Sequence, residues 1–194
     1  MKPLKIVIAD DEAIIRMDLR EMLEEAGHEV VGETANGRRA VAIVRDTRPD
    51  LVDLDIQMPD MAGVEAARMI AADQLAPVLL LTAFDDAELI RRATEAGVLA
   101  YLVKPVSEKS LFPAMEIALS RWRETESLEK ELAETRDSLE TRKLLDRAKG
   151  ILMQAHGISE EEAYRRMQRY SMEKRRTLKE GAAAVVRAGT KKRT

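Results

Sequence analysis

The stretch LVDLDIQMP, from Leu51 to Pro59, gives the first indication of the fold. Pro49 precedes its apolar residues and Pro59 follows them, and proline cannot continue a central strand because it lacks an N–H group. The two prolines therefore bracket a short buried strand that carries Asp55 at its carboxyl end. Ligands bind at this end of the strands in open parallel α/β sheets. Asp55 is therefore a candidate binding residue.

Three other apolar runs also end in polar side chains. Residues 5–9 end in Asp10 and Asp11, residues 77–81 end in Thr82, and residues 98–103 end in Lys104. Carboxylate oxygens suit Mg²⁺, which usually takes one or two carboxylates from a protein and keeps several waters. An ammonium and a hydroxyl suit the oxygens of a phosphoryl group. The pattern therefore predicts a magnesium site beside an anion site.

Between these runs, apolar residues recur at helical spacing, as they do over residues 14–23. Strands that are apolar throughout and alternate with helices are typical of a parallel sheet covered on both faces. Residues 1–120 are therefore predicted to form an α/β domain of the (βα)5 type.

Residues 1–120 resemble the receiver domain of two-component response regulators. The motifs that carry the resemblance are Asp10-Asp11, Asp55 to Pro59, Thr82-Ala83 and Lys104-Pro105, in this order. The resemblance implies the flavodoxin-like fold, for which a receiver is a known example of the strand order. It also implies that the domain is a signalling switch and not an enzyme.

The resemblance assigns a role to each residue of the predicted site. It implies that Asp55 accepts a phosphoryl group from a sensor histidine kinase. It implies that Mg²⁺ is held by Asp10, Asp11, Asp55 and the backbone carbonyl of Gln57. It further implies that Thr82 and Lys104 contact the phosphoryl group and that Tyr101 reports the switch.

Asp53 departs from the receiver pattern, in which this position is ordinarily apolar. Side chains alternate along a strand, so Asp53 is predicted to share a face with Asp55. In a central strand this carboxylate would be buried. It would then be costly unless it is hydrogen-bonded or protonated.

Charge divides the chain into an acidic and a basic part. Residues 1–120 contain 13 lysines and arginines against 22 aspartates and glutamates, whereas residues 141–194 contain 15 against 6. The basic part predicts a polyanionic partner. There is no cysteine, no signal-peptide pattern and no apolar run near the roughly 20 residues of a membrane span, so we expect a cytoplasmic protein without a membrane partner.

A long helix is expected to follow the receiver-like part. Leu128, Leu132 and Leu139 fit a coarse heptad that Thr135 and Arg142 interrupt. Residues 121–140 are therefore interpreted as a helical linker that forms a short coiled coil. The alternative is a solvated helix held by ion pairs between residues four apart.

Residues 141–189 are predicted to form a small domain of three helices. The apolar face of the chain shifts near residue 141, which indicates a new packing unit. Ser159 with Glu162, and Thr177 with Glu180, form capping boxes that would open the second and third helices. The third helix is predicted to stop at Gly189, and residues 190–194 are predicted to be a disordered tail.

This small domain resembles the ANTAR RNA-binding domain of transcription antitermination regulators. The matching residues are Arg147 to Met153, Glu162 to Tyr164, Ser171 and Thr177 to Lys179, in family order. The resemblance implies binding to paired short RNA hairpins in nascent transcripts. Gly181 departs from the family, which usually has an apolar residue there, and glycine inside a helix costs ~1 kcal/mol relative to alanine. The third helix is therefore expected to be loose at this point.

Together these features predict a phosphorylation-controlled response regulator. Phosphorylation of Asp55 would favour a homodimer and control RNA binding for transcription antitermination. The predicted RNA-facing residues are basic, and they are Lys149, Arg165, Arg166, Lys174, Arg175, Arg176 and Lys179.

Two alternatives belong to other classes of protein. A DNA-binding regulator would use the same basic helices, because the attraction of lysine and arginine to phosphates serves either nucleic acid. An aspartate-nucleophile phosphatase is suggested by Asp53-x-Asp55, which is similar to the paired aspartates of the haloacid dehalogenase family. In that family, however, the pair usually follows the first strand.

Overall fold

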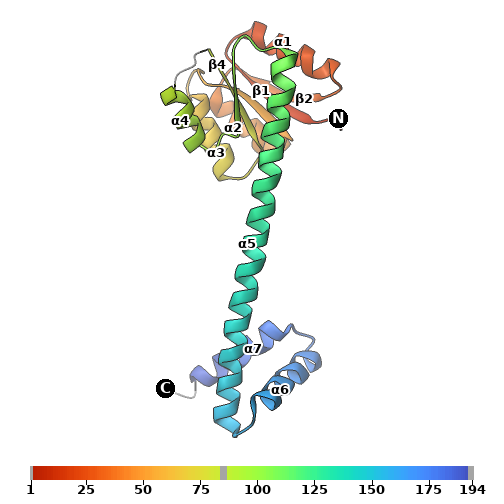
Figure 1. The fold of residues 1–194 in the computed structure, drawn as a ribbon, viewed down its shortest axis with the longest axis vertical. Coiled ribbons are helices and arrows are strands. Elements are labelled where there is room, and N and C mark those ends of the chain that lie inside the picture. Colours follow the sequence, from red (N-terminus) through yellow and green to blue (C-terminus); the bar gives the residue numbers. More distant parts are fainter. Residues whose placement is uncertain (1, 84–86, 192–194) are drawn as a thin grey trace. The chain divides into compact units, whose positions relative to one another are not determined.

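The protein is described by a computed structural model, shown in Figure 1, which covers the backbone of residues 2–83 and 87–191 and the side chains of residues 2–83 and 91–188. The chain forms two compact units, residues 1–126 and residues 127–194. We call them the N-terminal unit and the C-terminal unit.

The N-terminal unit contains the predicted parallel sheet. Its strands are β1 (Lys5–Ala9), β2 (Glu29–Thr34), β3 (Leu51–Asp55), β4 (Val78–Thr82) and β5 (Ala100–Val103). They are parallel and lie in the order β2-β1-β3-β4-β5. The (βα)5 fold with a flavodoxin-like sheet is therefore confirmed, and β3 lies at the centre of the sheet.

Helices cover both faces of this sheet. They are α1 (Ala13–Glu25), α2 (Gly37–Thr47), α3 (Gly63–Ala72), α4 (Ala87–Glu95) and the first part of α5 (Glu108–His156). Apolar residues of α1 and α5 pack on one face, and those of α2, α3 and α4 pack on the other. Leu51 packs with the residues of α1 and α5, whereas Val52 and Leu54 pack with those of α2, α3 and α4, so successive β3 side chains alternate between the two faces of the sheet.

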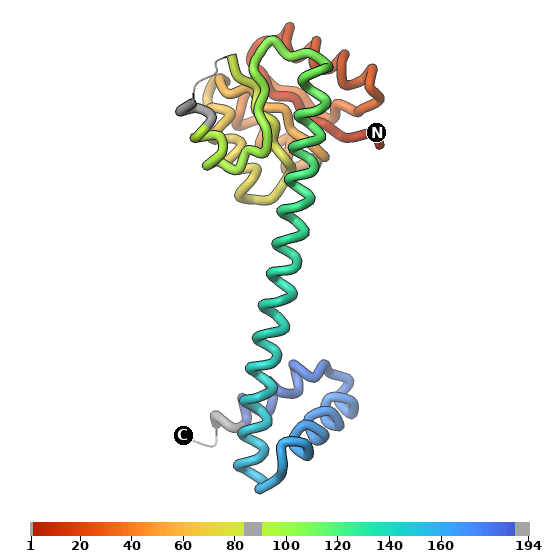
Figure 2. The backbone as a smooth tube through the Cα atoms, in the orientation of Figure 1, coloured from red at the N-terminus to blue at the C-terminus, as the bar shows by residue number. Residues whose placement is uncertain are grey.

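Helix α5 is continuous over 49 residues (Figure 2). The predicted boundaries near residues 120 and 140 both lie inside it, and Gly150 does not interrupt it. Among the described helices, none has both the length and the apolar character that crossing a bilayer requires.

The C-terminal unit is a three-helix arrangement. The end of α5 packs with α6 (Glu160–Glu173) and α7 (Leu178–Lys191) around Ala148, Met167 and Ala182. Of the two predicted capping boxes, the one at Ser159 has one of its two hydrogen bonds, and the one at Thr177 has both. The Ser159 side chain accepts a hydrogen bond from the Glu162 N–H at 3.3 Å, and Thr177 and Glu180 bond to each other's N–H groups.

One expectation about α7 was wrong. The helix does not stop at Gly189 but continues to Lys191. A glycine ends a helix when it adopts a left-handed conformation, as Gly157 does at the end of α5 with φ 63°, whereas Gly189 stays helical. Residues 192–194 of the predicted tail lie outside the described residues. At Gly181 a Cβ would lie 2.3 Å from Ser171 Oγ, so the glycine lets α6 and α7 approach closely.

Candidate functional site

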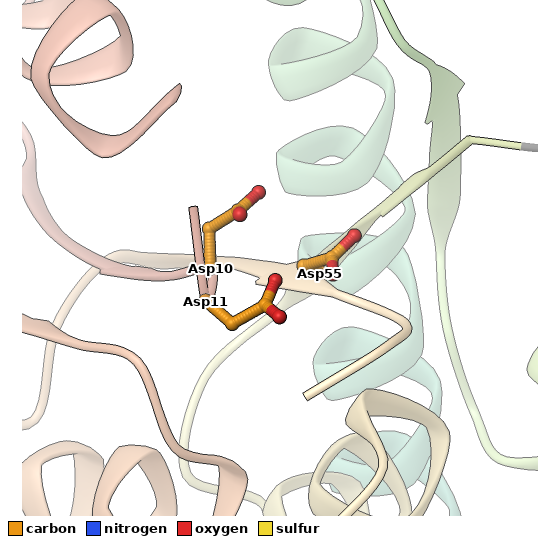
Figure 3. A group of neighbouring side chains, drawn as sticks. All are labelled: Asp10, Asp11 and Asp55. Carbon is orange, nitrogen blue, oxygen red and sulfur yellow. The ribbon is translucent and has the colours of Figure 1, made fainter. Parts of the chain in front are cut away.

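Three carboxylates meet at the carboxyl ends of β1 and β3. Asp10 and Asp11 directly follow β1, and Asp55 is the last residue of β3. One oxygen of each lies within 4.8 Å of an oxygen of the other two (Figure 3). Asp10 and Asp55 are buried, whereas Asp11 is exposed. Neighbouring parallel strands β1 and β3 pair directly, and this pairing brings the three side chains together.

Lys104 links two of these carboxylates. Its Nζ lies 2.7 Å from Asp10 Oδ2 and 3.0 Å from Asp55 Oδ1, and Glu12 Oε1 is 3.6 Å away. Burial opposes the charged ammonium, but the hydrogen bonds that Lys104 donates to Asp10 and Asp55 outweigh this effect, and the pKa of Lys104 is raised. The lysine therefore remains a cation inside the site.

The pKa of Asp55 is raised above its ordinary value. Burial is the largest cause, and the nearby charges of Asp10 and Asp11 add to it, while the hydrogen bond from Lys104 acts in the opposite direction. A carboxylate with a raised pKa is more basic and a better nucleophile than a solvated one. A cation placed among these acids would be strongly favoured.

Backbone contacts hold the acidic residues in place. Asp10 Oδ1 accepts from the Glu12 N–H at 2.9 Å, and the Asp10 carbonyl accepts from Arg16 Nη1 at 2.6 Å. Asp55 Oδ2 accepts from the Gln57 N–H at 3.2 Å. These bonds fix where the two buried carboxylates point.

Two glycines bring other segments against the loop that follows β3. A Cβ on Gly63, the first residue of α3, would lie 1.9 Å from the Asp55 carbonyl oxygen. A Cβ on Gly37, the first residue of α2, would lie 2.3 Å from the Met61 carbonyl oxygen. The loop that carries Gln57 is thus packed between the starts of two helices, at distances that only glycine allows.

The polar side chains surround a cavity of about 170 Å³. Its lining residues include Asp11, Asp55, Gln57, Thr82 and Lys104. Thr82 is buried at the end of β4. The structure therefore places these predicted site residues around one cavity, with Asp10 joined to them through Lys104.

Tyr101 lies elsewhere. Its side chain on β5 is 43% exposed, and it lines a separate groove together with Ala93, Ile117 and Arg121. The backbone still connects this region with the cavity, because the Lys104 N–H donates to the Thr82 carbonyl at 2.7 Å.

The oxygen ligands fit Mg²⁺, a hard cation that prefers carboxylates, carbonyls and water. The residues that could hold it are Asp10, Asp11, Asp55 and the carbonyl of Gln57. Sequence reasoning missed Glu12 and Arg16, which contact Lys104 and Asp10. Glu12 directly follows Asp11, and Arg16 lies four residues after Glu12 on α1, so their position shortly after the acidic pair is the signal that could have indicated them.

Asp53 is fully buried in the centre of the sheet. It lies between Ile8 and Leu79 in the register of the neighbouring strands. Neither of its carboxylate oxygens has a hydrogen-bond partner among the described residues, and burial raises its pKa to about 7. The expected burial of Asp53 is therefore observed, and no hydrogen bond from a described residue offsets the cost of burying its carboxylate.

The seven predicted RNA-facing residues fall into two groups. Four form ion pairs within the C-terminal unit, namely Lys149 with Asp146 and Glu160, Arg165 with Glu161, Arg166 with Glu162, and Lys179 with Asp137. Lys174, Arg175 and Arg176 lie in the turn between α6 and α7, are exposed, and form no ion pair with any described residue. The sequence did not distinguish these groups.

Comparison with known proteins identifies both units. The family model of the response regulator receiver domain matches residues 6–116, and that of the ANTAR domain matches residues 133–186. The transcriptional regulatory protein PdtaR of Mycobacterium tuberculosis is 48% identical over 193 residues, which cover 99% of this chain and 94% of PdtaR.

Other similarities concern the N-terminal unit alone. The chemotaxis protein CheY of Thermotoga maritima is 35% identical over 112 residues, which are 57% of this chain and 93% of CheY. Among solved structures, the signal receiver domain of a modulated diguanylate cyclase from Desulfovibrio desulfuricans G20 is 32% identical with a TM-score of 0.59. This match covers 63% of this chain and 98% of that domain.

Proposed function

Because this chain belongs to the response regulator receiver family and carries an ANTAR domain as its output, we propose that it is a phosphorylation-controlled RNA-binding regulator of transcription antitermination. The observation that carries the proposal is the cavity in which Asp55 and Lys104 meet beside Asp10, Asp11 and Thr82. The protein acts in the cytoplasm, where nascent transcripts are made.

The proposed chemistry begins at Asp55. Its carboxylate oxygen attacks the phosphorus of a phosphohistidine on a sensor histidine kinase. The P–N bond breaks, its electron pair remains on the imidazole, and Asp55 becomes an acyl phosphate. Lys104 is placed to pair with the transferred group, since its Nζ already lies 3.0 Å from Asp55 Oδ1. The Thr82 hydroxyl would donate to another phosphoryl oxygen.

Asp10, Asp11, Asp55 and the Gln57 carbonyl would hold Mg²⁺. When bound, this ion neutralises the charge of phosphoryl oxygens and carboxylates in the site. Lys104 alone cannot balance the three aspartates, which supports the need for a further cation.

Thr82 and β5 provide a route from the site to the surface. Thr82 pairs with Val103 in the register of β4 and β5, and Tyr101 lies two residues earlier on β5. Movement of Thr82 toward the phosphoryl group would let Tyr101 follow. That change would reshape the groove lined by Tyr101, Ile117 and Arg121.

Pairing of two chains would use a second surface, on the linker part of α5. Leu128, Leu132 and Leu139 are each at least half exposed. At about 100° per residue, these three leucines fall within an arc of about 40°. Such an unpartnered stripe supports a short parallel coiled coil with a second copy.

The part of α5 that follows the linker is compatible with this pairing. Leu144, Leu145 and Leu152 pack in the core with α6 and α7. On an ideal helix their face is centred about 150° away from the exposed leucine stripe, so the two surfaces do not compete. The heptad also places Glu131 and Arg136 where they can form an ion pair between parallel chains.

Covalent labelling tests the input. Incubation with a small acyl phosphate and Mg²⁺ should label the wild-type chain once, and Asp55→Asn should abolish the label. Label that survives in Asp55→Asn would show that another residue is the acceptor. The matched control is Asp53→Asn, two residues earlier on the same strand, which should retain the label.

Binding tests the output. A two-hairpin RNA is titrated with the unphosphorylated protein and with the protein treated with Mg²⁺ and beryllofluoride, while light scattering measures the mass. We expect tighter RNA binding and a dimer only after treatment. Equal affinity and equal mass in the two states would contradict the coupling, and preferential binding of duplex DNA would favour the DNA-binding alternative.

A further inference from the structure

The two ends of α6 carry opposite charge. Glu160, Glu161 and Glu162 lie at its N-terminus, and Lys174, Arg175 and Arg176 follow its C-terminus. This distribution matches the helix dipole and would stabilise the helix by itself. It also gives an approaching polyanion two very different surfaces.

At the acidic end, the cations already have partners. Lys149 Nζ lies 2.6 Å from Glu160 Oε1 and 2.8 Å from Asp146 Oδ1, and its side chain is only 18% exposed. Arg165 and Arg166 pair with the glutamates four residues earlier. An RNA phosphate here would meet carboxylates and would have to displace existing ion pairs.

At the basic end, the cations are available. Lys174, Arg175 and Arg176 are exposed, and no carboxylate among the described residues lies within ion-pair distance of them. Arg176 does help to lower the pKa of Glu180, although the hydrogen bond from the Thr177 N–H is the main cause. Three neighbouring cations without ion pairs favour the binding of phosphates.

The basic turn has a fixed backbone. The N–H groups of Lys174, Arg175 and Arg176 donate to carbonyls in the last turn of α6, at 3.0, 3.2 and 2.9 Å. Thr177 and Glu180 then begin α7 with reciprocal hydrogen bonds. The cations are therefore presented by a preorganised turn, which reduces the entropy lost on binding.

Arg175 occupies a position that normally favours glycine. Its φ is 51°, in the left-handed region, directly after a helix. A long cationic side chain in this unfavourable conformation, without an ion pair, suggests a role outside the unit's own stability.

Exposed apolar side chains lie beside the turn. Met172 is 79% exposed and Tyr170 is 37% exposed. The Tyr170 ring lies against α7, with Cδ1 at 3.7 Å from the position that a Cβ on Gly181 would occupy. The other exposed tyrosine of the unit, Tyr164, lies one helical turn after Glu160 and Glu161. Among the described residues of the C-terminal unit, Tyr170 is therefore the exposed tyrosine whose neighbouring cations lack ion pairs.

We propose that the α6–α7 turn, formed by Lys174, Arg175 and Arg176 together with Tyr170 and Met172, is the surface that contacts the unpaired loop of an RNA hairpin. The cations contact loop phosphates, and Tyr170 and Met172 contact unstacked bases. Lys149 and Lys179 instead act within the unit, where they join α5 to α6 and to α7. The inference rests on the proposed RNA-binding function and narrows its contact surface.

Two charge-matched double variants of the full chain test this surface. Arg175→Gln with Arg176→Gln removes two unpaired cations, and Arg165→Gln with Arg166→Gln removes two paired cations from the same unit. Each is titrated against a labelled two-hairpin RNA, with and without beryllofluoride. We expect the first to lower affinity at least tenfold and the second to change it less than twofold. The slope of log affinity against log salt should fall by about 1.4 in the first variant only, as for two lost contacts to single-stranded RNA.

The tyrosines provide a second matched pair. Tyr170→Leu retains apolar packing against Gly181 but removes the ring, and we expect it to lower affinity at least fivefold. Tyr164→Leu should leave affinity within twofold. Circular dichroism and thermal melting verify that all four variants fold.

The outcomes separate this inference from the function on which it rests. If the wild-type chain binds no hairpin RNA in either state, the proposed function fails. If the wild-type chain binds and both double variants lose affinity equally, general charge attraction explains binding and the assigned surface is wrong. Loss confined to the Arg165 and Arg166 variant, or to Tyr164→Leu, would overturn it as well.

Discussion

The two units arrange their charged residues in opposite ways. In the N-terminal unit, Asp10, Asp55 and Lys104 converge from three strand ends; the two aspartates are buried and the lysine side chain is only 11% exposed. In the C-terminal unit, the cations are spread over α5, α6 and α7, and several pair with carboxylates one helical turn away. The buried charge cluster therefore follows from the topology of the sheet, whereas the surface charge pattern depends on local side-chain partners.

This contrast has energetic consequences. Buried charges interact strongly and resist rearrangement, while exposed ion pairs contribute little and exchange partners readily. Substitutions near the buried cluster should therefore have large effects on stability, and substitutions in the exposed pairs should have small ones.

Asp53→Val should have the largest effect. The pKa of Asp53 is about 7 in the folded chain against an ordinary value of 3.8, so the folded state holds more protons between these values. Stability therefore decreases as pH rises from about 4 to about 7, by up to about 4 kcal/mol, and is constant above. Valine removes this penalty, and urea denaturation across pH should show a gain that increases with pH and then levels off.

The same variant should retain phosphorylation of Asp55, because Asp53 does not line the cavity. A loss of stability at pH 8, or a loss of labelling with normal folding, would show that Asp53 has a partner or a role that its surroundings do not reveal. Either result would show that the effect of a buried charge in the N-terminal unit does not follow from burial alone, which is the basis of the contrast between the two units.

Gly63→Ala should have the next largest effect, in the opposite direction. The added Cβ would meet the Asp55 carbonyl oxygen at 1.9 Å, so the start of α3 and the loop after β3 must move apart. We expect a destabilisation of about 2–3 kcal/mol in urea, together with slower labelling of Asp55.

Gly150→Ala is the matched control in α5. A Cβ at Gly150 meets no atom within 4 Å, so alanine should stabilise the helix by about 0.5–1 kcal/mol. Equal effects of the two substitutions would show that the close approach at Gly63 is not important.

Asp137→Asn should have the smallest effect. It removes the exposed ion pair with Lys179, which joins α7 to α5. We expect a decrease in thermal midpoint smaller than the increase from Gly150→Ala, and this decrease should vanish at high salt because screening already weakens the pair. A larger, salt-independent decrease would mean that the ion pair between Asp137 and Lys179 contributes as much to stability as the buried charges of the N-terminal unit do.

Sequence patterns were sufficient for the fold and for the residues of the acidic cavity. Apolar runs that alternate with helical periodicity produce a parallel sheet, and the carboxyl ends of its strands must meet at one edge. Asp10, Asp11, Asp55, Thr82 and Lys104 were therefore predicted as one group from their positions after apolar runs. The capping boxes at Ser159 and Thr177 were equally local, since each involves residues only three apart.

Contacts between residues distant in the sequence required the tertiary structure. Glu160 neutralises Lys149 from eleven residues away, and Asp137 pairs with Lys179 across 42 residues. At Gly181, helix propensity is a local property, but only the tertiary structure shows that the small size of this glycine lets α7 pack against Ser171. The lack of any hydrogen-bond partner for Asp53 is likewise a property of three neighbouring strands and not of β3 alone. Periodicity specifies which face of an element is buried, but the pairing of individual polar groups depends on three-dimensional distances that no local pattern encodes.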